Sequence, residues 1–323
     1  MKQYKKITAF LGVLALAAAP SFAQQIPGLE KIKGNLDELA GDFARGLAFN
    51  AGLGLWSDAY IGSIVGVPPH FGVGINAGVT TIKSTAFKGL LSDLGESDSS
   101  LTGLLDGLGL PLPAALVSAR VGGLVLPFDV GIKGMYLPSI SLGEIRSNYV
   151  FFGLDVRYAL IKDSGVLPAV SIGLGYTYVG GGLGLPIGQE QNINFNGQTV
   201  KFDRPELTIS WGNSSVDLNA QVSKKLLIIT PFLGIGASYG FSQVEFGVKG
   251  TVQANDGLKK IAEQFGFDLD SQGITSTIKG KGLSVRIYGG TSFDIAFIRL
   301  NLGVLYSPFG NNFGADFGIR FQL

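Results

Sequence analysis

The 323-residue sequence contains no cysteine. This absence excludes disulfide bonds and thiolate metal sites, so an exported chain of this kind depends on packing and hydrogen bonds. Histidine is almost as scarce, because His70 is the only one and it follows Pro69 without a partner at a recognisable spacing. A Ser-His hydrolase site or a His-Cys metal site is therefore not expected. We predict neither enzymatic activity nor a cofactor.

Long apolar runs are missing after residue 23. No later segment offers the ~18 consecutive apolar residues that a membrane-spanning helix needs. Yet hydrophobic residues make up 46% of the chain, charged residues only 15%, and the mean hydropathy is +0.33. This composition is too apolar for an ordinary soluble domain. A closed β-barrel is the other structure that satisfies its backbone inside lipid, and the 49 glycines suit strands that tilt and curve.

The start of the sequence predicts export. Three lysines within the first six residues precede an apolar run over residues 7–19, and the small residues Ser21 and Ala23 favour cleavage before Gln24. We therefore expect a signal peptide over residues 1–23 and an outer-membrane location. The formal net charge is +1, and subtracting these three lysines leaves −2 for the mature chain. Without a basic excess, a nucleic-acid partner is not expected.

The end of the sequence, residues 312–323, alternates with a period of two. Its apolar set is Phe313, Ala315, Phe317, Ile319, Phe321 and Leu323, and its polar or small set is Asn312, Gly314, Asp316, Gly318, Arg320 and Gln322. This period predicts a β-strand with one apolar and one polar face. A strand of a soluble sandwich would also alternate. Recurrence of the pattern along the chain favours a strand between lipid and a lumen.

Eleven segments of the chain are candidate strands. Bacterial single-chain barrels have even strand numbers, and residues 47–56 form the segment that fits least well. We predict an all-β fold, a transmembrane antiparallel β-barrel of 10 strands with 12 as the alternative, over residues 69–323. Short periplasmic turns are expected at 126–128, 162–167, 224–227 and 293–295, and long external connections at 83–113, 180–204 and 249–279. These connections are expected to contain short helices over 87–94, 101–108 and 258–265 and a hairpin around residues 196–197.

The N-terminal segment, residues 24–68, differs from the rest. Its apolar residues recur at steps of three and four over residues 24–46, which predicts a short amphipathic helix; they are Leu29, Ile32, Leu36, Leu39 and Phe43. Helical periodicity does not reveal what the apolar face contacts. The helix could lie on the periplasmic rim, lie on a membrane surface, or enter the lumen as a plug.

Charged residues of both signs fall on the predicted inner face of the barrel. The lumen-lining candidates are Arg120, Asp129, Lys133, Asp155, Arg157, Asp217, Arg286, Arg299, Asp316 and Arg320. Mixed signs favour ion-paired ladders, with a solute-selecting constriction as the second interpretation. Small inward residues on strand 170–178 are expected to leave space. The aromatic residues near strand ends are interpreted as membrane-interface anchors; they are Trp56, Trp211, Tyr136, Tyr149, Tyr158, Tyr178 and Tyr306.

The signal peptide, the alternating strands and the closing pattern F-x-F-x-I-x-F-x-L resemble those of bacterial outer-membrane β-barrel proteins. This resemblance covers the whole chain, although Leu323 stands where that class usually ends in Phe. It implies outer-membrane lipid and the barrel-assembly machinery as partners, the latter through the C-terminal strand. Residues 24–182 more narrowly resemble the FadL-type fatty-acid channel group, including its spirochaetal relatives, but lack an Asn-Pro-Ala motif near the start.

Two classes of function remain open after the sequence is considered. The first is a passive channel for small solutes, hydrophobic small molecules among them, with the N-terminal segment as a hatch. The second is a non-conducting, adhesin-like surface barrel that displays its long external loops.

Overall fold

The structure is a computed structural model in which residues 38, 41–61, 69–83, 107, 109–123, 126–142, 145–186, 191–195, 198–202, 206–249, 252–253 and 274–323 are described. The expected signal peptide and most of the expected loop helices, over 87–94, 101–108 and 258–265, lie outside these residues.

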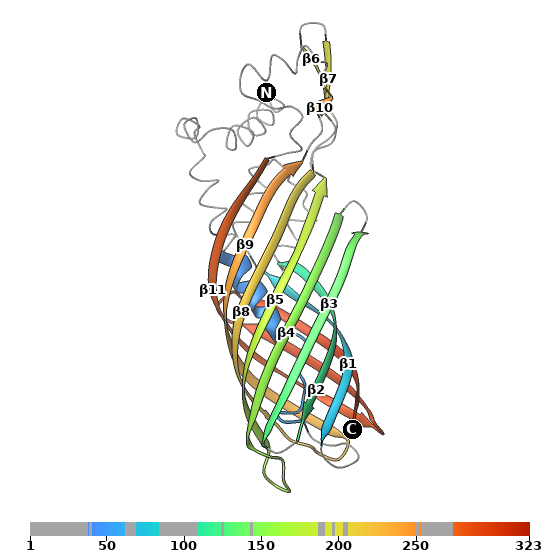
Figure 1. The fold of residues 1–323 in the computed structure, drawn as a ribbon, viewed down its shortest axis with the longest axis vertical. Coiled ribbons are helices and arrows are strands. Elements are labelled where there is room, and N and C mark those ends of the chain that lie inside the picture. Colours follow the sequence, from blue (N-terminus) through green and yellow to red (C-terminus); the bar gives the residue numbers. More distant parts are fainter. Residues whose placement is uncertain are drawn as a thin grey trace.

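Ten of the described strands close into an antiparallel barrel (Figure 1). In chain order they are β1 (His70–Ile82), β2 (Leu110–Gly122), β3 (Phe128–Leu142), β4 (Ile145–Ile161), β5 (Ala169–Pro186), β8 (Glu206–Ser223), β9 (Ile229–Lys249), β11 (Ile274–Ile295), β12 (Ile298–Ser307) and β13 (Asn312–Gln322). The first and last strands close the barrel with a register that runs from Gly72 opposite Gln322 to Thr80 opposite Gly314. The prediction of a 10-stranded barrel is confirmed.

The period of two places the apolar side chains on the outside of this barrel. Ile75 is 61% exposed and Val304 63% exposed, whereas the inward Arg286 and Ser238 are fully buried. This distribution of apolar and polar side chains is the reverse of that in a soluble protein, in which large apolar patches on the surface are rare. A continuous apolar exterior on a closed barrel is the surface that a transmembrane β-barrel presents to lipid. None of the helices in the described ranges is long and apolar enough to cross a membrane.

The strands differ greatly in length. β12 and β13 have 10 and 11 residues, whereas β9 and β11 have 21 and 22. About 9–11 residues cross a bilayer obliquely, so the long strands continue beyond the membrane. Figure 1 shows β5, β8, β9 and β11 rising together on one side of the barrel.

All three expected external connections are partly strand, and the connection over 83–113 is so from Leu110, where β2 begins. β5 continues to Pro186 through the glycines at 180–182, and β9 and β11 occupy most of the expected loop ends around residues 249 and 274–279. Glycine weakens an isolated strand, but here each residue pairs with a long neighbouring strand. Beyond the barrel, the short strands β6 (Gln191–Phe195), β7 (Gln198–Phe202) and β10 (Val252–Gln253) form a separate sheet, and β6 pairs with β7 across the expected hairpin.

Residues 41–61, named the luminal segment here, lie inside the barrel. Residues 41–49 are helical, the 3-10 turn η2 (Asn50–Gly52) follows, and the chain then continues without regular structure to residue 61. Figure 1 shows the helix in blue, surrounded by strands. Residues 47–56, the candidate strand that fits least well, do not form a strand, because their alternating apolar residues face a ring of wall side chains on several sides. The turn expected at 293–295 lies at residues 296–297.

Candidate functional site

The helical part of the luminal segment is held by apolar contacts. Phe43, Leu47 and Phe49 are at most 1% exposed. They belong to one buried cluster with inward-facing wall residues, which include Leu116, Tyr149, Phe151, Val179, Ile209, Trp211, Val244, Tyr288 and Leu305. The rings of Phe43 and Trp211 lie 5.7 Å apart between centroids at an angle of 55°. Burying each such side chain contributes about 1.5–3 kcal/mol, so this end is stabilised mainly by the hydrophobic effect.

The middle of the luminal segment is held by hydrogen bonds to the wall. The ammonium of Lys133 on β3 donates to the carbonyl oxygens of Ala51 and Leu53, both at 2.7 Å. Asn50 donates to the hydroxyl of Tyr149 at 3.1 Å and accepts from the hydroxyl of Thr80. Carbonyl groups at the end of a helix have no partner within the helix, so these wall side chains stabilise the point where the helix ends.

The last part of the luminal segment ends in an ionic anchor at Asp58. Its carboxylate accepts from Arg299 on β12 and, at 2.8 Å, from Arg320 on β13. Its backbone carbonyl accepts from Arg157 at 2.5 Å. Burial on its own would raise the pKa of Asp58, but Arg299 and Arg320 hold that pKa below its ordinary value. Asp58 is therefore ionised at neutral pH and joins three strands.

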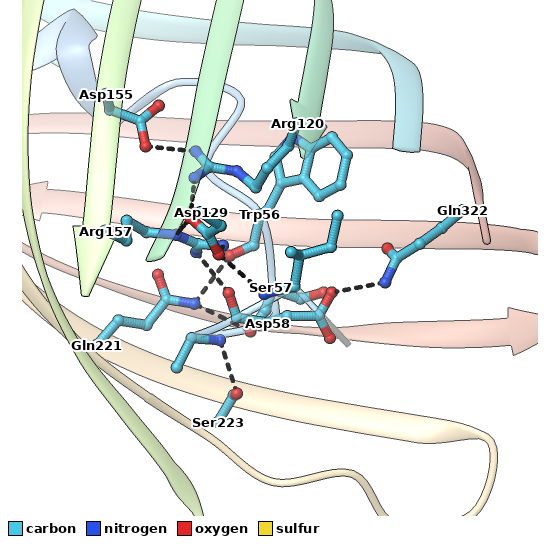
Figure 2. Close-up of polar contacts among 12 residues, drawn as sticks. Trp56, Ser57, Asp58, Arg120, Asp129, Asp155, Arg157, Gln221, Ser223 and Gln322 are labelled. Atoms are coloured by element: carbon cyan, nitrogen blue, oxygen red, sulfur yellow. Dashed lines mark hydrogen bonds and ion pairs between the residues drawn. The ribbon is translucent and has the colours of Figure 1, made fainter. Parts of the chain in front are cut away.

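A second anchor lies at Asp129 on β3. Arg157 donates to both of its carboxylate oxygens, at 2.8 and 2.7 Å, and Arg120 donates to it as well. The backbone N–H of Ile61 donates to the same carboxylate at 2.9 Å. Arg120 also binds Asp155, so the wall network continues to β4. Figure 2 shows how Arg157 lies between Asp129 and the backbone of Asp58.

Just before Asp58, the segment contacts the wall through Trp56 and Ser57. The guanidinium of Arg320 lies 4.4 Å from the centroid of the Trp56 ring, a cation–π geometry. Gln221 donates to the carbonyls of Trp56 and Ser57 at 2.8 and 3.0 Å, and the hydroxyls of Ser57 and Ser292 are 2.9 Å apart. These contacts come from β8, β11 and β13, so the segment is bonded to several sides of the barrel. Figure 2 shows the contacts with Gln221 on β8.

All ten lumen-lining candidates project inward, and all but Asp155, whose side chain is 15% exposed, are classed as buried. The structure brings Arg120, Asp129, Asp155 and Arg157 together, places Arg299 and Arg320 at Asp58, and pairs Asp217 with Arg286. Lys133 binds the two carbonyls described above. Among the described residues, Asp316 forms no ion pair, and its Oδ2 has no hydrogen-bond partner.

Asp58 was not among the candidate residues, because no local pattern distinguishes it from the other polar residues of the N-terminal segment. Trp56, Trp211 and Tyr149 were expected at the membrane interface, and this prediction is wrong because their side chains are buried in the lumen. The other expected anchors are exposed on the outside; they are Tyr136, Tyr158, Tyr178 and Tyr306. Aromatic residues near strand ends fit either environment, so residue type alone does not distinguish them.

The space expected along the small-residue face of β5 is occupied. A Cβ atom added to Gly173 would lie 2.7 Å from Oδ1 of Asn219 and 3.1 Å from Cγ of Arg157. Long side chains from the neighbouring strands thus fill the room that small residues leave.

Glycines of the wall fit the shape of the luminal segment. A Cβ atom added to Gly72 would lie 2.7 Å from the Trp56 ring, one on Gly122 would lie 2.5 Å from Ile61, and one on Gly240 would lie 2.7 Å from the carbonyl oxygen of Ala44. Contacts below 3.0 Å do not occur for real Cβ atoms. The wall therefore leaves room for this segment, and larger residues at these positions would displace it.

Comparison with protein families gives a match over residues 76–323, to the family described as "Family of unknown function (DUF6588)". The chain belongs to this family. The matched range begins within β1, so the luminal segment precedes it. A search of curated proteins finds no match.

Several solved structures are similar to this DUF6588 member over most of their length. The outer membrane protease OmpT from Escherichia coli is 8% identical with a TM-score of 0.39, and the match covers 80% of this chain and 99% of OmpT. The toluene transporter TodX from Pseudomonas putida is 8% identical with a TM-score of 0.30, covering 85% of this chain and 96% of TodX. The attachment invasion locus protein Ail from Yersinia pestis is 9% identical with a TM-score of 0.26, covering 79% and 99%. At these identities the likeness concerns the fold alone.

Proposed function

We propose that this protein is a passive outer-membrane channel for small solutes, hydrophobic ones among them. The luminal segment closes the channel, and displacement of that segment opens it. The apolar exterior of the barrel and the expected signal peptide support the outer-membrane location.

The observation that carries this proposal is the fit between wall glycines and the luminal segment. Gly72, Gly122 and Gly240 leave space that Trp56, Ile61 and Ala44 occupy. A barrel that only displays loops could fill its lumen with wall side chains, as small barrels commonly do. Here the filling is a separate stretch of chain, and the described contacts between it and the wall are non-covalent. Removing it would leave a lumen lined by glycine and by charges of both signs.

A reversible lock tests the proposal. The hydroxyls of Ser57 and Ser292 are 2.9 Å apart, and the chain has no cysteine, so Ser57→Cys with Ser292→Cys introduces one defined disulfide between the segment and β11. We expect liposomes containing the oxidised variant to show neither conductance nor uptake of small apolar solutes. Reduction should restore conductance and uptake to the wild-type level. Deletion of residues 24–61 should raise both above the wild-type level, by at least about tenfold.

The two single-cysteine variants, treated with the same oxidant, control for effects of oxidation on the membrane. Heat-modifiable migration in gels would show that each barrel is folded. If the deletion variant is folded and remains closed to ions and to apolar solutes, the channel proposal is wrong. The barrel would then be a non-conducting protein of the surface.

A further inference from the structure

A groove lies on the outside of the barrel, where β5, β8, β9 and β11 continue beyond the apolar band. Its volume is about 520 Å³. The outward side chains of Tyr178, Phe241, Gln243, Glu245 and Lys279 surround it, and Gly212 lies in its floor. None of the residues that form the ionic anchors borders it, although Trp211, whose ring packs against Phe43 inside the barrel, does.

Strand register orders the groove into three rows. In the row nearest the apolar band, Tyr178, Ser214, Phe241 and Lys281 are successive partners across the strands. In the next row the partners are Gly180, Gly212, Gln243 and Lys279, and in the third they are Gly182, Ser210, Glu245 and Thr277. The aromatic residues thus lie in the first row, the lysines in the first two rows and the acidic residue in the third.

The middle row forms the floor because two of its members have no side chain. A Cβ atom added to Gly212 would lie 3.4 Å from the hydroxyl oxygen of Tyr178, which is ordinary contact. The floor is therefore open at Gly212, whereas a Cβ atom added to Gly180 would lie 3.0 Å from both the Tyr178 hydroxyl oxygen and Cγ1 of Val150. On the membrane side of the floor, the hydroxyl groups of Tyr176 and Ser214 share a hydrogen bond of 3.0 Å. This bond orders the aromatic residues at the lower edge of the groove.

The groove begins where the lipid-facing surface ends. Below it, outward residues of the same strands are apolar and exposed, including Leu174, Leu218 and Leu283. Tyrosine and phenylalanine at this level are typical of the membrane interface. A molecule seated in the groove would have its lower part among acyl chains and its upper part in water, which fits a membrane lipid better than a soluble ligand.

The polar residues indicate the headgroup of that lipid. Exposed Lys279 and Lys281, two residues apart on β11, would attract a phosphate at the interface. Glu245 in the third row would repel a phosphate but accept hydrogen bonds from hydroxyl groups, and Ser210 and Gln243 beside it can donate and accept. This order suits phosphate close to the membrane and sugar hydroxyls above it.

We propose that this groove binds the headgroup of a phosphorylated glycolipid in the outer leaflet. The short turns at residues 164–167, 226–229 and 296–297 lie at the opposite ends of these strands and are expected in the periplasm. The groove is therefore assigned to the outer leaflet. The proposal does not depend on whether the lumen conducts.

Titration of fluorescent diphosphoryl lipid A into the purified full-length protein in detergent tests this proposal. Lys279→Gln with Lys281→Gln should weaken binding about tenfold or more, because each lysine near a charged interface contributes measurably to anion attraction. The matched control is Lys162→Gln with Lys225→Gln, which makes the same charge change at the opposite end and should leave affinity unchanged. Gly212→Leu, which fills the floor without a change of charge, should also weaken binding at least fivefold, a decrease of about 1 kcal/mol.

The other lipids distinguish the possible ligands. Phosphatidylglycerol and a phosphate-free glycosyl diacylglycerol should each compete less well than lipid A, and inorganic phosphate should not compete. Equal competition by phosphatidylglycerol would contradict the sugar assignment, and competition by inorganic phosphate would contradict a lipid site. If folded Gly212→Leu and the double lysine variant both bind lipid A like the wild type, the groove is not its site.

Discussion

The two ends of the luminal segment are held in the barrel by different interactions. Around Phe43 and Leu47 the contacts are apolar and come from a broad cluster of wall side chains. Around Asp58 the contacts are ion pairs and hydrogen bonds to particular atoms on β4, β12 and β13. Both ends are buried to a similar degree, so burial alone does not explain the difference.

The difference shows how one segment can be both firmly seated and correctly aligned. Apolar burial is non-directional and tolerates small shifts along the lumen. An ion pair between buried groups adds little net stability, because desolvation offsets the attraction, but it strongly penalises any arrangement that leaves one charge alone. We infer that the apolar end supplies most of the binding free energy and that the Asp58 end determines the position of the segment.

Two fully buried alanines allow the two ends to be compared directly. Ala44 lies in the helical part and Ala59 beside the ionic anchor, and both are 0% exposed. Because the chain has no cysteine, Ala44→Cys and Ala59→Cys each provide a single thiol that a charged reagent reaches only when that end opens. The labelling rate of each thiol in liposomes measures local release.

The largest effect is expected from Asp58→Asn. This change leaves buried Arg320 without its acidic partner, at a cost of about 3–5 kcal/mol, whereas Arg299 keeps its ion pair with Asp294. Labelling of the thiol at position 59 should rise by roughly a hundredfold or more, with a smaller rise at position 44. Asp163→Asn, which removes a partly exposed ion pair with Lys224, is the control and should change neither rate. Equal rises at both positions would show that the segment moves as one unit.

Phe43→Ala should have the next largest effect, at the other end. It removes a fully buried ring that contacts Trp211, at a cost of about 3 kcal/mol, and the effect should not depend on salt. Labelling at position 44 should rise more than labelling at position 59. The exposed ring of Phe309 gives the control Phe309→Ala, for which no change is expected. A larger rise at position 59 would contradict the division into two ends.

Lowering the pH should weaken the ionic end only in strong acid. The pKa of Asp58 is held below its ordinary value of 3.8. Its stabilisation is therefore complete above that value and is lost as pH falls through the lowered pKa, by about 1.4 kcal/mol per pH unit. The difference in position-59 labelling between wild type and Asp58→Asn should be constant from pH 8 to about pH 5 and shrink below about pH 4. A difference that already shrinks near pH 6 would mean that another group controls this end.

The smallest effect is expected from Trp56→Phe. The ring of phenylalanine is a weaker partner for Arg320, and the hydrogen bond from the indole N–H to Ser118, 3.3 Å long, is lost. Together these changes should cost about 1 kcal/mol and raise labelling at position 59 about fivefold. Trp211→Phe is the matched variant at the apolar end and should act on position 44. If both substitutions act equally on both thiols, the ends are not independent.

Alternation in the sequence was sufficient to predict much of the barrel. Closing residues such as Phe317 and Ile319 alternate with Asp316 and Arg320, and the structure places the first pair outside and the second pair inside. The ten inward charged residues follow from the same period. A period of two is a local property, because neighbouring side chains on a strand must point to opposite faces. Such features can be read without knowledge of the strand's partners.

The luminal segment could not be placed by the same reasoning. Asp58 meets Arg299 and Arg320 across 241 and 262 residues of sequence, and no local pattern records such contacts. Residues 47–56 alternate like a strand yet are helical at one end and irregular at the other, since they contact wall residues on many sides rather than two flat faces. Trp56 and Trp211 were misplaced for a related reason, because a large amphipathic ring suits either the membrane interface or a buried lumen.

The order of residues is enough to specify strands with one apolar and one polar face, and to assign the charged residues to the polar face. Those properties arise from each residue and its immediate neighbours. Three features depend on closure of β1 on β13 and on the register of every strand between them. They are the pairing of the charges, the occupant of the lumen and the position of the outer groove. A one-residue shift in that register would turn each inward arginine toward lipid, so these features are set by the assembled barrel as a whole.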